Sequence, residues 1–130
     1  MTNLNYAVSA YKKTMVNTAP SRVDLVIMLY DGAIEFLHKA VFYMEQKDPR
    51  NRLHHVRQKL HYMQRAIDII QELLRTLNME AGGQVAENLR RLYVYMLKEL
   101  THANIKNDPE RISRVQGLLR TLREGWRGIR

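Results

Sequence analysis

The sequence predicts an all-α fold, an antiparallel four-helix bundle with a short N-terminal arm or extra helix. Of the 130 residues, 45% are apolar, which is enough to form a core in a chain whose length suits one domain. Apolar positions recur at steps of three and four along four segments of helical length. Short breaks at Asp48-Pro49, Gly82-Gly83 and Asp108-Pro109 separate these segments, and short connections favour antiparallel neighbours. We expect a single domain, with an arm over residues 1–20 and the bundle over residues 21–130.

The first helix is expected to begin at Ser21, which with Asp24 forms a start similar to a capping box. At about 100° per residue, one face of this helix carries the core positions Val26, Leu29, Tyr30, Ala33, Leu37, Ala40 and Met44. Leu25 lies at the margin of the polar side, and Ile27, Met28 and Phe42 project from it. The helix therefore has more apolar surface than one core face needs.

The second helix has the most regular pattern. Its steps of three and four form one seam, made of Leu53, Val56, Leu60, Met63, Ile67, Ile70, Leu74 and Leu77. A second stripe beside the seam contains Tyr62, Ala66, Ile69 and Leu73.

The third helix follows Gly82-Gly83, a turn that we expect to need a positive φ angle. Its core face carries Val85, Leu89, Leu92, Tyr93, Met96, Leu100 and Ala103, and Ala86 and Leu97 widen it. Asp108 as N-cap and Pro109 as the first helical residue predict the start of the fourth helix. That helix repeats apolar residues at Ile112, Val115, Leu119, Leu122, Trp126 and Ile129. Across the bundle we predict seven buried residues: Leu60, Ile67, Leu74, Leu89, Met96, Leu119 and Leu122.

The composition excludes several classes of protein. The chain has no cysteine, which excludes a disulfide scaffold, a cysteine-based zinc site and a cysteine nucleophile, and which fits a reducing compartment. No apolar run approaches the ~18 residues of a membrane-spanning helix, and residues 1–6 lack the features of a signal peptide. We expect a soluble, intracellular protein.

Two Glu-x-x-His motifs, at Glu35–His38 and Glu99–His102, have the spacing used by di-iron bundles. The pattern argues against such a site, because neither pair points inward as a unit and the facing seams are apolar. The remaining histidines, His54, His55 and His61, are spaced too widely from carboxylates to share an ion. No nucleophile motif or phosphate-binding loop is present. We therefore predict no catalytic centre, no metal and no cofactor.

The net charge of +8 keeps a second hypothesis open, that of a basic bundle that binds nucleic acid. A row of arginines along the last helix could follow a phosphate backbone: Arg120, Arg123, Arg127 and Arg130. No RNA-binding or helix-turn-helix motif accompanies the row. A third hypothesis is an oligomerisation module that uses the long apolar seams.

Four stretches, in order and with matching spacing, resemble one known family. They are residues 28–33 (MLYDGA), residues 82–89 (GGQVAENL), residues 92–96 (LYVYM) with Ala103-Asn104 after them, and residues 118–126 (LLRTLREGW). Asn5, Tyr6 and Tyr11 fit the N-terminal segment of the same family. The chain resembles the flagellar export chaperone family FliS over nearly its whole length. It departs from the family pattern at Arg22, Asn78 and Gln84, where Pro, Asp and Glu are usual.

The resemblance implies a bacterial cytoplasmic chaperone that binds the disordered C-terminal segment of flagellin. Such a chaperone prevents premature polymerisation and presents its cargo to the flagellar export gate, without a nucleotide or other cofactor. It inserts into no membrane and uses no specific nucleic acid or small-molecule substrate.

A disordered amphipathic cargo needs an extensive apolar groove, because ordering the cargo is costly. The spare apolar positions are our candidates for that surface: Leu25, Met28, Tyr62, Ile69, Leu73 and Leu97. Asn104, in the matched Ala103-Asn104 motif, and Val8 and Tyr11 of the arm complete the predicted partner-binding set. We expect the arm to cover part of the groove in the free protein and to move when flagellin binds.

Overall fold

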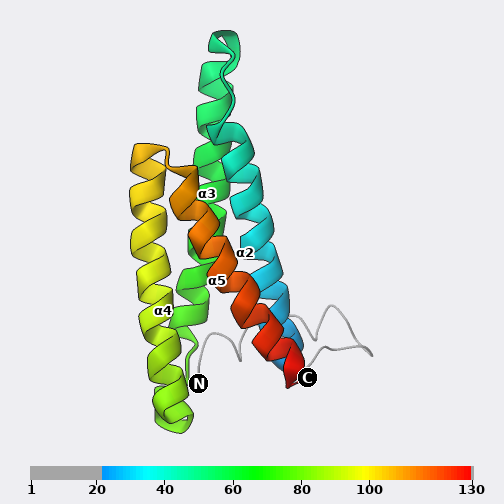
Figure 1. Ribbon diagram of the computed structural model, residues 1–130, viewed down its shortest axis with the longest axis vertical. Helices are drawn as coiled ribbons and strands as arrows, with labels where there is room; N and C mark the ends of the chain where they lie inside the picture. Colours follow the sequence, from blue (N-terminus) through cyan, green and yellow to red (C-terminus); the bar gives the residue numbers. More distant parts are fainter. Residues whose placement is uncertain (1–21, 130) are drawn as a thin grey trace.

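Four long α-helices and one 3-10 turn form the part of the chain that the computed structural model describes, residues 22–129 (Figure 1). They are α2 (Arg22–Met44), η1 (Pro49–Asn51), α3 (Arg52–Arg75), α4 (Met79–Lys106) and α5 (Pro109–Gly128). No strand occurs within residues 22–129, so the predicted all-α bundle is confirmed. The predicted arm and the predicted helix start at Ser21 lie outside the described residues. Within the same range, no helix combines the length and the apolar character needed to cross a membrane.

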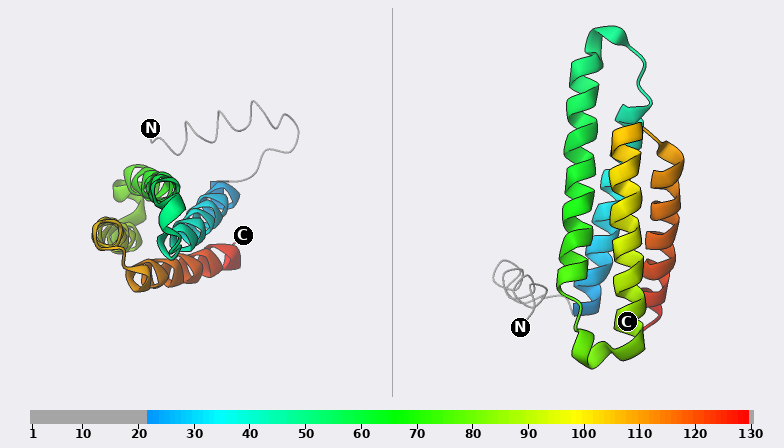
Figure 2. Two further views of the ribbon diagram at one scale, coloured as in Figure 1. Left: turned by 90° about the horizontal axis from the view of Figure 1, so that it is seen from above. Right: turned by 90° about the vertical axis from the view of Figure 1, so that its left-hand side faces the viewer.

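Each helix packs against two neighbours: α2 and α4 both contact α3 on one side and α5 on the other. Seen from above, the four helices surround one shared core (Figure 2). Figure 1 shows that α4 and α5 meet near the loop that joins them and diverge toward their other ends. The N-terminal end of α3 and η1 project beyond α4 and α5 (Figures 1 and 2). The helices therefore differ at the two ends of the bundle: α3 projects beyond α4 and α5 at one end, and α4 and α5 separate at the other.

Local capping explains where three elements begin. The Asp48 carboxylate accepts a hydrogen bond from the Arg50 amide at the start of η1, at 3.0 Å. Asn78 Oδ1 accepts from the Ala81 amide at 3.0 Å and caps α4. Asp108 caps α5 as predicted, with its carboxylate accepting from the Glu110 and Arg111 amides.

Gly83 has the positive φ that the sequence predicts, at φ 54° and ψ −133°. As the sequence predicts, the main part of the third helix begins after Gly82-Gly83, and Gly83 forms the kink that joins it to the short helical turn before it within α4. The chain leaves α3 earlier, over residues 76–78, where Asn78 supplies the cap. The first turn of α4 therefore lies at an angle to the rest of the helix.

The core confirms part of the predicted buried set. Leu89, Met96 and Leu119 are buried, while three further members are only partly buried: Ile67, Leu74 and Leu122. The prediction for Leu60 is wrong, since its side chain is 46% exposed. Four residues of α3 lie fully in the core: Met63, Ala66, Ile70 and Leu73. Two of them come from each predicted stripe, so the buried face of α3 lies between the two stripes.

Five other burial assignments also need correction. Val85 and Ile129, which the pattern places in core seams, are 67% and 68% exposed. Val85 follows the kink at Gly83, and both residues lie where α4 and α5 diverge. Ile27, assigned to the polar side of the first helix, is buried. The upper residues of the α3 seam, Leu53 and Val56, are exposed because that end of α3 projects beyond α4 and α5.

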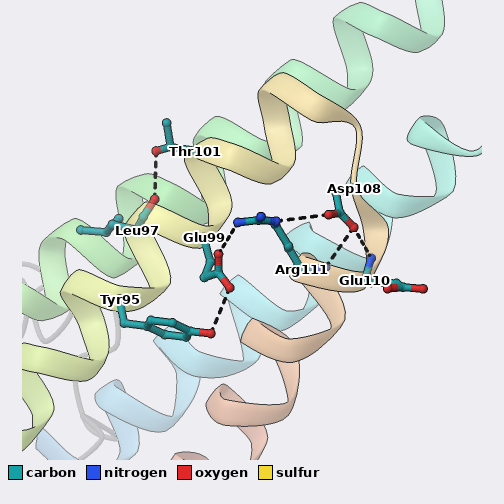
Figure 3. Close-up of polar contacts among 7 residues, drawn as sticks. All are labelled: Tyr95, Leu97, Glu99, Thr101, Asp108, Glu110 and Arg111. Carbon is teal, nitrogen blue, oxygen red and sulfur yellow. Dashed lines mark hydrogen bonds and ion pairs between the residues drawn. The ribbon is translucent and has the colours of Figure 1, made fainter.

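Ionic contacts hold α4 to α5 at the end where the two helices meet (Figure 3). The Glu99 carboxylate accepts hydrogen bonds from Arg111 Nη1 at 2.8 Å and from the Tyr95 hydroxyl at 3.0 Å. Arg111 Nε in turn donates to Asp108 Oδ2 at 3.2 Å. The Tyr95 hydrogen bond and the Arg111 charge hold the pKa of Glu99 below its usual value. These contacts fix the α4–α5 junction at its upper end only.

Candidate functional site

An apolar pocket of about 300 Å³ opens at the end of the bundle opposite η1. All four helices contribute to it, with these apolar side chains on its walls: Val23, Val26, Leu73, Leu77, Val85, Ala86, Leu89 and Trp126. A shallower hollow of about 250 Å³ shares Val85, Leu89 and Trp126 and extends along α5 to Ile129. We call the two together the end groove.

The end groove follows from the divergence of α4 and α5. Both halves of α5 are tied to α2, because Gln116 Nε2 donates to the Ile34 carbonyl at 3.2 Å and, further down, Arg123 Nη1 donates to Asp31 Oδ1 at 2.8 Å. The Glu99–Arg111 pair holds α4 to α5 only near their connecting loop. Apolar residues that would otherwise meet across α4 and α5 are therefore left facing a groove.

A buried polar network fixes the position of Trp126 on the wall of the groove. Its Nε1 donates a hydrogen bond to the Tyr30 hydroxyl at 2.9 Å. The Tyr30 hydroxyl also bonds the Tyr93 hydroxyl, and both tyrosines are almost fully buried. Burial raises the pKa of both tyrosines above the ordinary value, so their hydroxyls stay protonated. The network joins α2, α4 and α5 directly behind the groove.

The surface of the end groove is suited to an apolar partner. Val85 and Ile129, which line it, are largely exposed. Arg22 is the one charged residue among those lining the main pocket in the described part of the chain. Contiguous exposed apolar surface with a polar edge is typical of protein-binding sites, and an amphipathic helix fits a groove of this kind.

Four of the predicted partner-binding residues lie on α2 and the C-terminal half of α3. Leu25 and Leu73 are 7% and 3% exposed, so they offer little surface to a partner. Leu73 nevertheless lines the end groove from within. Met28 is 44% exposed, and the half-buried Ile69 packs against Gly32 of α2.

Tyr62 belongs to a different surface, a stack of aromatic rings between α2 and α3. Its ring lies 6.0 Å from that of Phe36 and 5.9 Å from that of Tyr43, measured between ring centroids. The Lys39 ammonium lies 5.4 Å from the centre of the Tyr62 ring, at cation–π distance. Tyr62 thus contributes to the α2–α3 contact as well as to the surface.

Leu97 and Asn104 lie on α4, away from the end groove. Leu97 is half-buried beside a shallow hollow with Thr101, whose hydroxyl donates to the Leu97 carbonyl at 2.9 Å (Figure 3). The Asn104 carbonyl accepts a hydrogen bond from Lys59 Nζ at 2.9 Å. Val8 and Tyr11 lie outside the described residues. The predicted set therefore does not form one surface, and partner binding by its members stays a prediction.

Val85, Trp126 and Ile129 contribute to the surface of the groove, which their pattern in the sequence does not indicate. Their helical spacing assigns them to core seams, which is correct only if α4 and α5 stay in contact along their whole length. The available signal was Gly82-Gly83, two residues before Val85, because a kink there changes the direction of the helix where Val85 begins its seam.

The two Glu-x-x-His motifs are arranged as the periodicity predicts. Glu35 and His38 are exposed on α2. On α4, the Glu99 carboxylate is engaged by Arg111 and Tyr95, and His102 is exposed. In residues 22–129, no three side chains of His, Asp or Glu come together in a way that could hold a metal ion.

Comparison with known proteins identifies similar chains. The family model described as flagellar protein FliS matches residues 3–130. The flagellar secretion chaperone FliS of Salmonella typhimurium is 37% identical over 126 residues, which cover 94% of this chain and 88% of that protein. The Vibrio cholerae protein of the same name is 36% identical over 123 residues, covering 92% and 85%. The Bacillus subtilis protein of that name is 33% identical over 119 residues, covering 92% and 82%.

Proposed function

Because the chain belongs to the FliS family of flagellar secretion chaperones, we propose that it binds the C-terminal segment of flagellin in the bacterial cytoplasm. Bound there, that segment cannot take part in premature polymerisation, and the complex can be delivered to the flagellar type III export gate. The observation that carries this proposal is the end groove, an apolar surface built from four helices. The proposed activity is non-enzymatic and needs no cofactor.

The chemistry of the end groove supports a helical, apolar ligand. An amphipathic segment can insert side chains at positions i, i+3 and i+4 between α4 and α5, against Val85, Leu89 and Trp126. Ordering a disordered segment costs several kcal/mol, so one pocket is too small a surface to bind it alone. Further apolar side chains exposed on α2 and α3, such as Met28 and Leu60, extend the available surface beyond the groove.

We further propose that the N-terminal arm occupies part of the cargo surface in the free protein, through Val8 and Tyr11. Flagellin must then displace the arm, which lowers its apparent affinity by the free energy of arm docking. Deleting residues 1–16 should leave the bundle folded and increase self-association. Hydrogen exchange of the arm amides should rise when cargo binds, and unchanged exchange would contradict the arm proposal alone.

The arginine row on α5 gives little support to nucleic-acid binding. Arg123 pairs with Asp31 at 2.8 Å, and Arg127 pairs with Glu124 at 2.8 Å. Both guanidinium groups therefore already have an acidic partner within the bundle. A steep salt dependence of binding to arbitrary nucleic acid would be needed to favour that hypothesis.

Isothermal titration calorimetry with a flagellin C-terminal peptide tests the proposed site. We expect Val85→Asp to weaken binding by about tenfold or more, because a carboxylate would be buried against apolar cargo without a partner. Ile105→Asp is the matched control, since Ile105 is 72% exposed on the same helix, against 67% for Val85. Equal affinities of the two variants would contradict the assignment of the groove. Absence of binding by the unsubstituted chain would contradict the function.

A further inference from the structure

A buried lysine without an acidic partner lies at the other end of the bundle. Lys59 of α3 is 7% exposed. Its Nζ donates to the Asn104 carbonyl at 2.9 Å and to Asn107 Oδ1 at 3.0 Å. Both acceptors are neutral, and within residues 22–129 no carboxylate forms an ion pair with Lys59. Its burial lowers the pKa of the ammonium group below the ordinary value.

The two acceptors explain part of this arrangement. Asn104 lies in the last turn of α4 and Asn107 is its C-cap, in the left-handed conformation with φ 53°. Lys59 therefore lies at the negative end of the α4 dipole, which carries about half an elementary charge. An ammonium group has three donors and a full charge. One donor therefore remains for another ligand, and no carboxylate within residues 22–129 pairs with the charge.

Lys59 lines a hollow of about 340 Å³ between the end of α2, η1 and the start of α3. Lys47, Arg52 and His55 also line it. His55 Nδ1 is buried and has no hydrogen-bond partner in the described part of the chain. Three cationic groups and an unpaired ring nitrogen thus surround one cavity, which we call the tip pocket.

The single acidic residue in the described lining of the tip pocket is already engaged. Asp48 accepts hydrogen bonds from the Arg50 amide and from Asn51 Nδ2, both at 3.0 Å. These bonds, led by the one from the Arg50 amide, hold the pKa of Asp48 below its usual value. The Asp48 carboxylate is thus committed to capping η1, and it forms no ion pair with Lys59.

We propose that the tip pocket binds a glutamate or aspartate carboxylate in an acidic segment of a partner protein. The lining combines cations with the apolar side chains of Tyr43, Met44 and Val56, so it can hold both a carboxylate and its aliphatic stem. Residues 46–61 contain five basic residues and one acidic residue, and their α3 end projects beyond α4 and α5 (Figure 1). A longer acidic segment would therefore find matching charge around the pocket.

This site lies at the opposite end of the bundle from the end groove, so the proposal does not depend on flagellin binding. The test is an amide-shift titration of the full chain by NMR, with an end-blocked tetraglutamate peptide as probe. We expect the largest shifts at the amides of His55 and Asn107. Largest shifts elsewhere would overturn the proposal, and so would no binding by the unsubstituted chain.

Two substitutions distinguish the contribution of the buried Lys59 to peptide binding from attraction by surface charge in general. Lys59→Met keeps the length of the side chain and should weaken tetraglutamate binding by about tenfold. Lys98→Met, an exposed site on α4 outside the pocket, should change it by no more than about twofold. Equal loss in the two variants would show only non-specific attraction and would overturn the proposal. If Lys59→Met does not fold, Arg52→Gln at the exposed edge of the pocket should give a several-fold loss, and no loss would overturn the proposal.

Two further ligands distinguish a peptide carboxylate from other chemistry. A tetraglutamine peptide should not bind, because it lacks the charge. Inorganic phosphate should bind more weakly than tetraglutamate, since it has no aliphatic stem to contact Met44 and Val56. Tighter binding of phosphate than of the peptide would overturn the assignment to a protein partner.

Discussion

The hydrogen-bonded network behind the end groove can be tested by removing its hydroxyl groups one at a time. Tyr30→Phe removes the acceptor for Trp126 Nε1 and the partner of the Tyr93 hydroxyl. Tyr93 is 1% exposed, so its orphaned hydroxyl costs about 1–3 kcal/mol of stability. Trp126 is half-buried, and its N–H can reach water at a smaller cost. We therefore expect Tyr30→Phe to lower the free energy of unfolding by about 1–3 kcal/mol.

The second variant completes a double-mutant cycle. Tyr93→Phe leaves the Trp126–Tyr30 hydrogen bond in place and should cost about 1 kcal/mol. The double variant lacks both hydroxyls, so neither leaves the other orphaned. Its cost should be below the sum of the two single costs by about 1 kcal/mol. Urea unfolding followed by circular dichroism measures all four proteins at constant m-value. If the loss of stability in the double variant equals the sum of the losses in the two single variants, the network is refuted.

Three other properties follow from the same structure. Met63→Ala, at a fully buried site, should lower the free energy of unfolding by about 2–5 kcal/mol. Leu60→Ala, at a site one turn earlier on α3 that is 46% exposed, should lower it by less than half as much in the same urea experiment. Gly83→Ala should lower the free energy of unfolding by about 1–3 kcal/mol through backbone strain alone, because φ is 54° and nothing lies within 4 Å of the new Cβ. Gly117→Ala is the control: its site is equally open but helical, so the substitution should be neutral or stabilising. Arginine hydrogen bonds lower the pKa of Glu87 from 4.5 to about 2, so its contribution is present above pH 4.5 and is lost as the pH falls toward 2. Acid titration of Glu87→Gln should accordingly show a smaller loss of stability over that range than the unsubstituted chain.

Local sequence chemistry predicted much of the fold. Asp108 and Pro109 fix the start of α5, and the positive φ of Gly83 follows from glycine alone. Periodicity identified α3 as a helix but not its rotation about its own axis. Two adjacent apolar stripes leave that angle undetermined, so Leu60 was assigned to the core, whereas the core includes Ala66. The packing of neighbouring helices determines which side of α3 faces the core, and this packing cannot be derived from the sequence of one helix.

The candidate site was less accessible to sequence reasoning. Its walls come from four helices, and two ion pairs between different helices, Arg123–Asp31 and Glu99–Arg111, hold α5 against α2 and against the upper end of α4. Neither pairing can be derived from a pattern along one helix. Trp126 therefore resembled an ordinary seam residue, although it lines the groove. Resemblance to a family predicted the kind of partner, while the surface offered to that partner required the arrangement of α4 and α5.

The fluorescence of Trp126 offers the most direct test that flagellin occupies the end groove, because it is the only tryptophan in the chain. The measurement is a titration of the full chain with a tryptophan-free peptide from the C-terminal segment of flagellin. Insertion of apolar cargo beside the indole should remove water from it, so we predict a saturable shift of its emission to shorter wavelength. The midpoint should coincide with the binding curve from calorimetry. Binding detected by calorimetry with unchanged Trp126 emission would contradict the central claim, because cargo would then bind away from the groove.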